Sequence, residues 1–115
     1  MTLISLEIDQ ITISNRFRKA DYFAFLDKNK ITIEKNEHKL SKSNEFFDYF
    51  NDLNIKKIYL KSLGYKTFLK LEKLGISVYF VNNRERFNEI EEGDLSLINH
   101  ANAKLLCTLG HRGRS

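Results

Sequence analysis

Four side chains in this 115-residue chain are potential ligands for a soft metal ion, because thiolate and imidazole groups suit iron–sulfur and zinc centres. They are Cys107, His38, His100 and His111. Cys107 and His111 are four residues apart, which aligns them only in a helix that continues past Gly110. With a single cysteine, the chain lacks the ligands of a closed zinc site. We expect no structural metal and keep His38 and Cys107 as candidate metal ligands.

The stretch Ser62-Leu63-Gly64 opens a predicted helix and could present backbone N–H groups to an anion. The same residues fit a simple tight turn, which every strand-to-helix connection needs. Lys61, the preceding residue, could neutralise a bound anion or stay solvated.

A basic cluster surrounds an aromatic residue near the start of the chain. Arg16, Arg18 and Lys19 flank Phe17. This pattern could stack on nucleic acid and neutralise it, or Phe17 could anchor its loop in the core. The net charge of +4 is mild and basic residues interleave with acidic ones, so a solvated surface is favoured and nucleic acid is not the expected partner.

The sequence does not predict catalysis. It contains no GxSxG, HExxH, Walker-A or GxGxxG motif. A two-metal nuclease needs carboxylates on its central strands. Glu7 and Asp9 could supply one position, but the predicted fourth strand and its end, residues 55–62, contain lysines and no acid. We therefore predict a binding protein rather than an enzyme.

The elements that position these residues are clearest between Asn54 and Val81. β-favouring residues at both ends flank a stretch with helical apolar spacing, and Gly75 stands where a helix needs a left-handed stop. This is a βαβ unit, whose parallel strands are joined by a right-handed crossover. Such units gather helix N-termini and loops at one sheet edge, where anions and cofactors bind.

Turn-rich and alternating patterns predict further strands before this unit. The five predicted strands cover residues 3–8, 22–27, 30–35, 55–60 and 76–81. A helix capped by Ser41 or Ser43 is expected between the third and fourth strands, with Phe46, Phe50 and Leu53 on one face.

Two more helices are expected after the fifth strand. The first, capped by Asn82 or Asn83, would hold Phe87 and Ile90 and stop at Gly93. The second would begin at Asp94, and its apolar stripe would be formed by Leu95, Ile98, Ala101 and Leu105.

This element order predicts a three-layer α/β/α domain with a five-stranded mixed sheet in the order 3-2-1-4-5, in which strand 2 is antiparallel to its neighbours. One edge of the sheet would then collect the loops 9–21, 36–43, 61–64 and 82–83. His38 would be the only imidazole on that edge. The expected core residues are Phe23, Phe25, Phe46, Phe50, Ile58, Leu60, Phe68, Leu71, Val78 and Phe80.

Length and composition fit one domain, residues 1–106, followed by a basic tail, residues 107–115, whose final Arg114-Ser115 could be a cloning remnant. A hydrophobic fraction of 42% and nine phenylalanines favour a packed globule. No apolar run approaches the roughly 20 residues of a membrane span, and a single cysteine suits a reducing compartment. We expect a cytoplasmic protein that does not bind a membrane.

Several stretches resemble one known family. Residues 13–23, ISNRFRKADYF, resemble the S-x-x-F-G-x-A-x-x-F opening of the dinitrogenase iron–molybdenum cofactor biosynthesis domain, the NifX-type group. Asn36 falls where that family has Asn-Pro. Residues 61–79, KSLGYKTFLKLEKLGISVY, resemble its I-G-x-x-A-x-x-x-L-x-x-x-G-I-x-V block, and residues 85–95 resemble its closing helix. The resemblance covers roughly residues 1–97 and is strongest in the βαβ block.

The resemblance implies a ribonuclease H-like fold and non-catalytic carriage of an iron–sulfur or iron–molybdenum-type cluster, or its precursor, for cofactor-assembly proteins in nitrogen fixation. Taken with the predicted sheet edge, it implies a binding site made of Asn15, Arg16, Asn36, His38, Ser62, Leu63 and Gly64.

The chain departs from the family pattern at its proposed site. Arg18, Glu37, Lys61 and Ser62 stand where the family has glycine, proline or small residues. Glycine lets the backbone approach a bulky ligand, so these changes narrow or re-charge the site. Two alternatives therefore stay open: a metal-free protein-interaction or regulatory module, and a nucleic-acid-binding domain.

Overall fold

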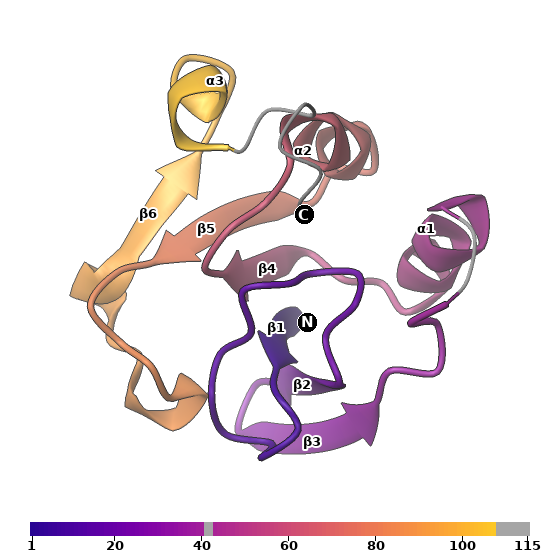
Figure 1. The fold of residues 1–115 in the computed structure, drawn as a ribbon, viewed down its shortest axis with the longest axis vertical. Helices are drawn as coiled ribbons and strands as arrows, with labels where there is room; N and C mark the ends of the chain where they lie inside the picture. Colours follow the sequence, from indigo (N-terminus) through magenta and orange to yellow (C-terminus); the bar gives the residue numbers. More distant parts are fainter. Residues whose placement is uncertain (41–42, 108–115) are drawn as a thin grey trace.

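The computed structural model describes residues 1–40 and 43–107, which form one mixed α/β sheet structure (Figure 1). The strands are β1 Thr2–Leu6, β2 Tyr22–Asp27, β3 Lys30–Lys35, β4 Lys57–Leu60, β5 Ser77–Val81 and β6 Leu95–Ile98. The helices are α1 Ser43–Asp52, α2 Tyr65–Lys73 and α3 Ala103–Leu106, with 3-10 turns at Phe87–Glu89 and Glu92–Asp94.

The sheet has six strands in the order β3-β2-β1-β4-β5-β6. The predicted order of the first five strands is confirmed, and β2 is antiparallel to both of its neighbours as expected. β1, β4 and β5 are mutually parallel. The predicted five-stranded sheet is wrong in its strand number, because β6 adds an antiparallel sixth strand beside β5.

The helix predicted to begin at Asp94 is replaced by β6 and the short helix α3. Residues 95–98 pair with β5 across four positions, from Val81↔Leu95 to Val78↔Ile98. The Asn99 side chain then accepts the backbone N–H of Ala101, at 2.9 Å, and turns the chain. A short apolar run fits both the helical and the strand period. Here the pairing of residues 95–98 with β5 determines that they form a strand.

The helix predicted to hold Phe87 and Ile90 is also absent. The backbone here pairs with the first loop instead: Phe87 N–H donates to Ile11 O at 3.0 Å, and Ile13 N–H donates to Glu85 O at 2.8 Å. The Arg84 guanidinium donates to Asp94 Oδ2 at 2.6 Å, and this bond lowers the pKa of that carboxyl. These contacts hold residues 84–94 as two 3-10 turns.

The predicted three-layer arrangement is therefore wrong. Figure 1 shows α1, α2 and α3 on one side of the sheet and the connection between β5 and β6 on the other. The side chains of all three helices join the larger core cluster. On the opposite side, which we call the open face, Phe87 and Ile90 pack on a smaller cluster around Ile4, Leu6 and Val81.

The βαβ unit forms as predicted. α2 ends at Gly75, whose φ of 78° is left-handed. Gly75 N–H donates to Glu72 O at 2.9 Å, and Ile76 N–H donates to Leu71 O at 3.1 Å. This pair of bonds is a Schellman motif, which ends the helix and starts the next strand without an intervening loop.

The expected core residues are all buried, each with an exposed fraction of 9% or less. Their centre is a group of phenylalanine rings beneath α1. Phe17 packs edge-on against Phe46 and Phe50, with ring centroids 5.2 and 5.3 Å apart. Phe23 meets Phe50 at 5.9 Å. Edge-to-face pairs at these distances stabilise a core beyond area burial alone.

Truncating Phe50 should be among the most damaging core changes. We expect Phe50→Ala to lower the free energy of unfolding by roughly 3–5 kcal/mol, because it removes a fully buried ring and leaves a cavity. Denaturant titration measures the loss. Leu40→Ala is the control, since Leu40 is 95% exposed and its truncation should change stability little. A loss below about 1 kcal/mol for Phe50→Ala would contradict the packing described here.

Candidate functional site

The carboxyl ends of β1, β3, β4 and β5 lie at one edge of the sheet, which we call the site edge. The register shows it directly: Leu6, the last residue of β1, pairs with Tyr22, the first of β2, and Tyr22 pairs with Lys35, the last of β3. Loop 7–21 leaves β1 at this edge, and the β4–α2 turn begins there. The loops that carry the predicted site residues therefore start from a common edge.

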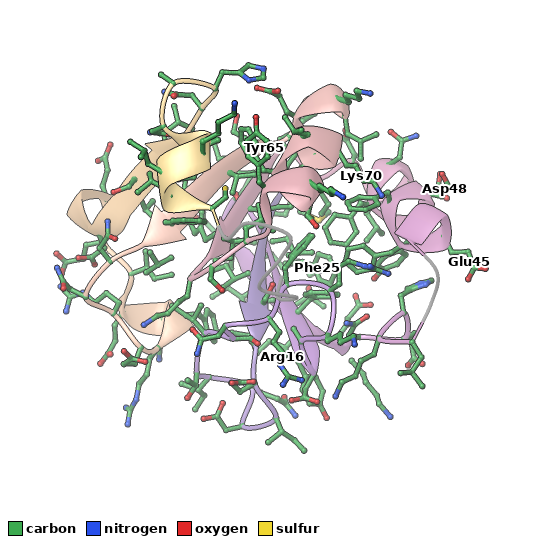
Figure 2. All side chains as sticks on the ribbon, turned by 45° about the horizontal axis from the view of Figure 1, so that its top comes forward. Arg16, Phe25, Glu45, Asp48, Tyr65 and Lys70 are labelled. Atoms are coloured by element: carbon green, nitrogen blue, oxygen red, sulfur yellow. The ribbon has the colours of Figure 1, made fainter. Side chains whose placement is uncertain are left out.

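Two of these loops are joined by a direct bond. The Ser62 hydroxyl in the β4–α2 turn donates to the backbone carbonyl of Asn15 at 2.7 Å. The next backbone N–H, of Arg16, donates to the Ser14 hydroxyl at 3.0 Å. Ser14 is buried, whereas Asn15 and Arg16 are exposed. Loop 7–21 is thereby fixed against the turn that opens α2, with Arg16 reaching outward (Figure 2).

Asn36 holds the other half of the site edge together. Its amide nitrogen donates to Arg18 O and Ala20 O, both at 2.9 Å, and its amide oxygen accepts the backbone N–H of His38 at 2.9 Å. Both amide hydrogens and one oxygen lone pair are used, and the side chain is only 5% exposed. Asn36 is therefore a structural residue that fixes loop 7–21 to the end of β3.

His38 is half-buried beside α1. Its ring lies against Tyr49, with centroids 4.2 Å apart and an angle of 32° between the planes. Burial raises the pKa of the Tyr49 phenol, with further contributions from Glu34 and Glu37, so this hydroxyl stays protonated. Among the described histidines, His38 is the one at the site edge. His100 pairs with Glu72 near the end of α2, at the opposite edge.

In the β4–α2 turn, Leu63 and Gly64 are both buried. Leu63 is fully buried, so its side chain is unavailable to a ligand. Gly64 is the N-cap of α2, with φ of −72° and ψ of 145°, and no side chain caps this helix start. The first N–H groups of a helix have no partner within the helix and carry its positive dipole end. An anion is the ligand that suits such a terminus.

The site edge carries charges of both signs, and loop 7–21 alone has three acidic and three basic residues. Arg16 and Lys19 are exposed, and within the described part of the chain neither forms an ion pair. Lys61 is bound to Glu85 at 2.9 Å, and Lys39 is bound to Asp21. An anionic ligand would therefore meet Arg16 and Lys19 as uncompensated positive charges.

Phe17 does not belong to a binding surface. It is fully buried between α1 and the sheet, so its ring is unavailable to stack on a base. The core-anchor interpretation of this residue is confirmed. The aromatic part of the predicted nucleic-acid pattern is thereby lost.

The second candidate metal ligand, Cys107, lies away from the site edge. It follows α3, is 5% exposed and belongs to the core cluster. Burial raises the pKa of its thiol to about 11, which disfavours the thiolate that binds metals. His111, its predicted partner, lies outside the described residues. Within residues 1–40 and 43–107, no three His, Cys, Asp or Glu side chains converge as metal ligands.

Sequence reasoning missed two buried serines near the site edge. The Ser14 hydroxyl orients Arg16, as described above. Ser5, in β1, is fully buried, and no described group hydrogen-bonds to its hydroxyl. Only the family-like S-x-x-F pattern marks Ser14 in the sequence, and nothing marks Ser5.

The comparisons with known proteins show the fold of this chain. No protein-family profile and no curated protein sequence matches it. Among solved structures, the crystal structure of PH0822 is similar with a TM-score of 0.68 and 18% identity, over 90% of this chain and 97% of that one.

Two further structures share this fold. The apo form of the orange protein from Desulfovibrio gigas has a TM-score of 0.64 and 16% identity, over 84% of this chain and 91% of that one. A Thermotoga protein, TM1290, is described as NifB-like and as a member of the DUF35 family. Its NMR structure has a TM-score of 0.56 and 20% identity, over 74% of this chain and 76% of that one.

Removing the Asn36 amide should destabilise the protein without touching an apolar contact. Asn36→Ala leaves two carbonyls and one N–H without their partner, and we expect a loss of about 2 kcal/mol in denaturant titration. Asn29→Ala, at the exposed β2–β3 turn, is the matched control. Equal stabilities for the two variants would show that Asn36 does not fix the loop.

Cys107 should react slowly in the folded protein. With a thiol pKa of about 11, roughly one molecule in a thousand carries the thiolate at pH 8. We expect alkylation by iodoacetamide to be about 100-fold slower than in urea, where the thiol has its ordinary pKa. The folded-state rate should keep rising with pH up to about pH 11. Equal rates in the folded and unfolded states would contradict the burial of this thiol.

Proposed function

We propose that this protein is a non-catalytic binding or carrier protein for an anionic metal cluster or its precursor, of the iron–sulfur or iron–molybdenum type. The ligand would be cargo held at the site edge and passed to a cofactor-assembly partner. The observation that carries this proposal is the Ser62–Asn15 hydrogen bond, which fixes the exposed Arg16 loop against the start of α2, a helix start that no side chain caps.

The chemistry of the site edge suits an anionic cluster that has been assembled elsewhere. The positive dipole end of α2 and the guanidinium of Arg16 attract negative charge without coordinating a metal. The described residues offer no set of three ligands, and His38 alone could supply one coordinating nitrogen. Carriage by electrostatic contacts fits this inventory better than cluster construction on the protein.

The structural neighbours support a cofactor-related role. One is the apo form of the orange protein, and another is described as NifB-like. Their low identity limits this support to the shared fold, so the function rests on the site itself. The sequence patterns around Phe17, Asn36 and Gly64 resemble the cofactor biosynthesis family, and the structure brings these residues to neighbouring loops of one edge.

The proposal is tested with a small molybdenum–sulfur dianion, tetrathiomolybdate, titrated anaerobically into the purified protein and followed by calorimetry and absorption. We expect binding that weakens as salt rises from about 50 to about 500 mM. Arg16→Glu should weaken it at least tenfold, because it replaces an attractive charge with a repulsive one. Lys28→Glu, at the β2–β3 turn on the opposite edge, makes the same charge change and should leave the affinity unchanged.

Each outcome of this titration is informative. Equal weakening by Arg16→Glu and Lys28→Glu would mean that only net charge matters and would contradict a defined site. The absence of binding by the unaltered protein, both to tetrathiomolybdate and after reconstitution with iron and sulfide, would overturn the carrier function.

The role of His38 is separable from that of the charges. If the imidazole coordinates the cluster, His38→Ala should reduce the iron retained after anaerobic reconstitution, while His100→Ala should not. Cys107→Ser is expected to match the unaltered protein, because this thiol is buried. Loss of iron with Cys107→Ser and retention with His38→Ala would place the ligand near the chain end instead.

A further inference from the structure

The open face of the sheet carries a continuous row of registered side chains. The row runs through paired positions on all six strands, one residue from each. Its members, from β3 to β6, are Ile33, Ala24, Ile4, Tyr59, Tyr79 and Leu97. Ile33 and Leu97 at its two ends are 36% and 47% exposed, and Ile31 beside them on β3 is 58% exposed.

This face is hollowed, and its groove is lined by charged residues, Lys57, Glu91 and Glu92, as well as by apolar ones. A groove of about 680 Å³ lies over β4, β5 and β6, with Tyr59, Tyr79 and Leu97 in its floor and Phe87 and Ile90 in its wall. The three described helices all lie on the other face. Among the described residues, no helix covers the open face, and Phe87 and Ile90 of the β5–β6 connection cover part of it.

We propose that the open face is covered by a second copy of this chain, docked face to face through a two-fold axis that runs along the strands between β1 and β4. Such an axis places β3 of each copy over β6 of the other. In the shared row, the exposed Ile33 then faces the exposed Leu97 of the second copy, whereas Ile4 and Ala24 are already buried within each copy. An isologous contact of this kind closes on itself and stops at a dimer.

The exposed apolar residues of the row suit this axis. They lie at its two ends, Ile33 on β3 and Leu97 on β6, which the axis brings together. The exposed Ile31 and Ile33 of β3 approach the groove bordered by Phe87 and Leu97 of the second copy. Such a contact would remove exposed apolar side chains of both copies from water.

The charges at the two ends of the open face are opposite. Lys35 lies at the β3 end and is exposed. It is on the open face because Tyr22, its partner in the sheet register, is on that face. Glu92 lines the groove at the β6 end and is exposed. Within the described residues, neither side chain forms an ion pair. The two-fold axis brings Lys35 of each copy toward Glu92 of the other, near the level of Leu95.

The test is the mass in solution by sedimentation equilibrium, from about 1 to about 500 µM protein. We expect a monomer–dimer equilibrium that reaches twice the 13.6 kDa of the chain. Ile33→Lys and Leu97→Lys should each raise the dissociation constant about a hundredfold, because each buries a charge in the apolar row. Leu105→Lys is the control, since Leu105 is 87% exposed on α3, on the other side of the sheet.

A charge exchange makes the test specific for this axis. Lys35→Glu and Glu92→Lys should each weaken the dimer, and the double variant should restore it. Circular dichroism checks that each variant is folded. A wild-type monomer at about 500 µM would overturn the proposal and leave the groove to a small ligand or another protein. A dimer unaffected by Ile33→Lys and Leu97→Lys would also overturn it, since the contact would lie elsewhere.

This dimer is independent of the carrier function. The axis leaves Arg16 and the start of α2 outside the shared row, so Leu97→Lys should keep the tetrathiomolybdate affinity of the unaltered protein. Loss of binding in that variant would contradict this separation and place the ligand on the open face.

Discussion

The placement of loop 7–21 is the constraint on which the candidate site depends. The loop leaves β1 and returns to β2, and it has little secondary structure of its own. The burial of Phe17 among the rings of Phe46 and Phe50 fixes its middle against α1. Asn36 then fixes its end, and Ser62 fixes the segment before Phe17. The burial of Phe17 thus determines where the exposed Arg16 lies, so the geometry of the candidate site follows from packing in the core.

Most of the fold could be predicted from the sequence, because its signals are local. Gly75 ends α2 through its positive φ, and the turn residues between β2 and β3 predict the hairpin that the structure shows. The region after β5 could not be predicted. Phe87 and Ile90 have helical spacing, but their backbone pairs with loop 7–21, and Leu95 and Ile98 pair with β5. These are contacts between distant residues, which periodicity does not record.

The sequence predicted which loops share the site edge, but it did not predict the structural roles of several residues on them. Asn36 and Leu63 were expected to bind a ligand, yet one is fully committed to the backbone and the other is buried. The absence of a helix between β5 and β6 has a second consequence, because no helix of the described residues then covers the open face. The same local departure from the expected α/β/α arrangement thus separates two surfaces: the site edge, suited to an anion, and the open face, suited to another copy of the chain.

The central claim is that an anion binds between loop 7–21 and the start of α2. Amide chemical shifts in a nitrogen-15 NMR titration with tetrathiomolybdate test it most directly, because each backbone N–H reports separately. The account predicts that the largest shifts fall on Gly64 to Thr67 and on Asn15 and Arg16, with little change at Tyr59, Tyr79 and Leu97. Shifts concentrated on the open face, or spread evenly over the exposed lysines, would contradict it.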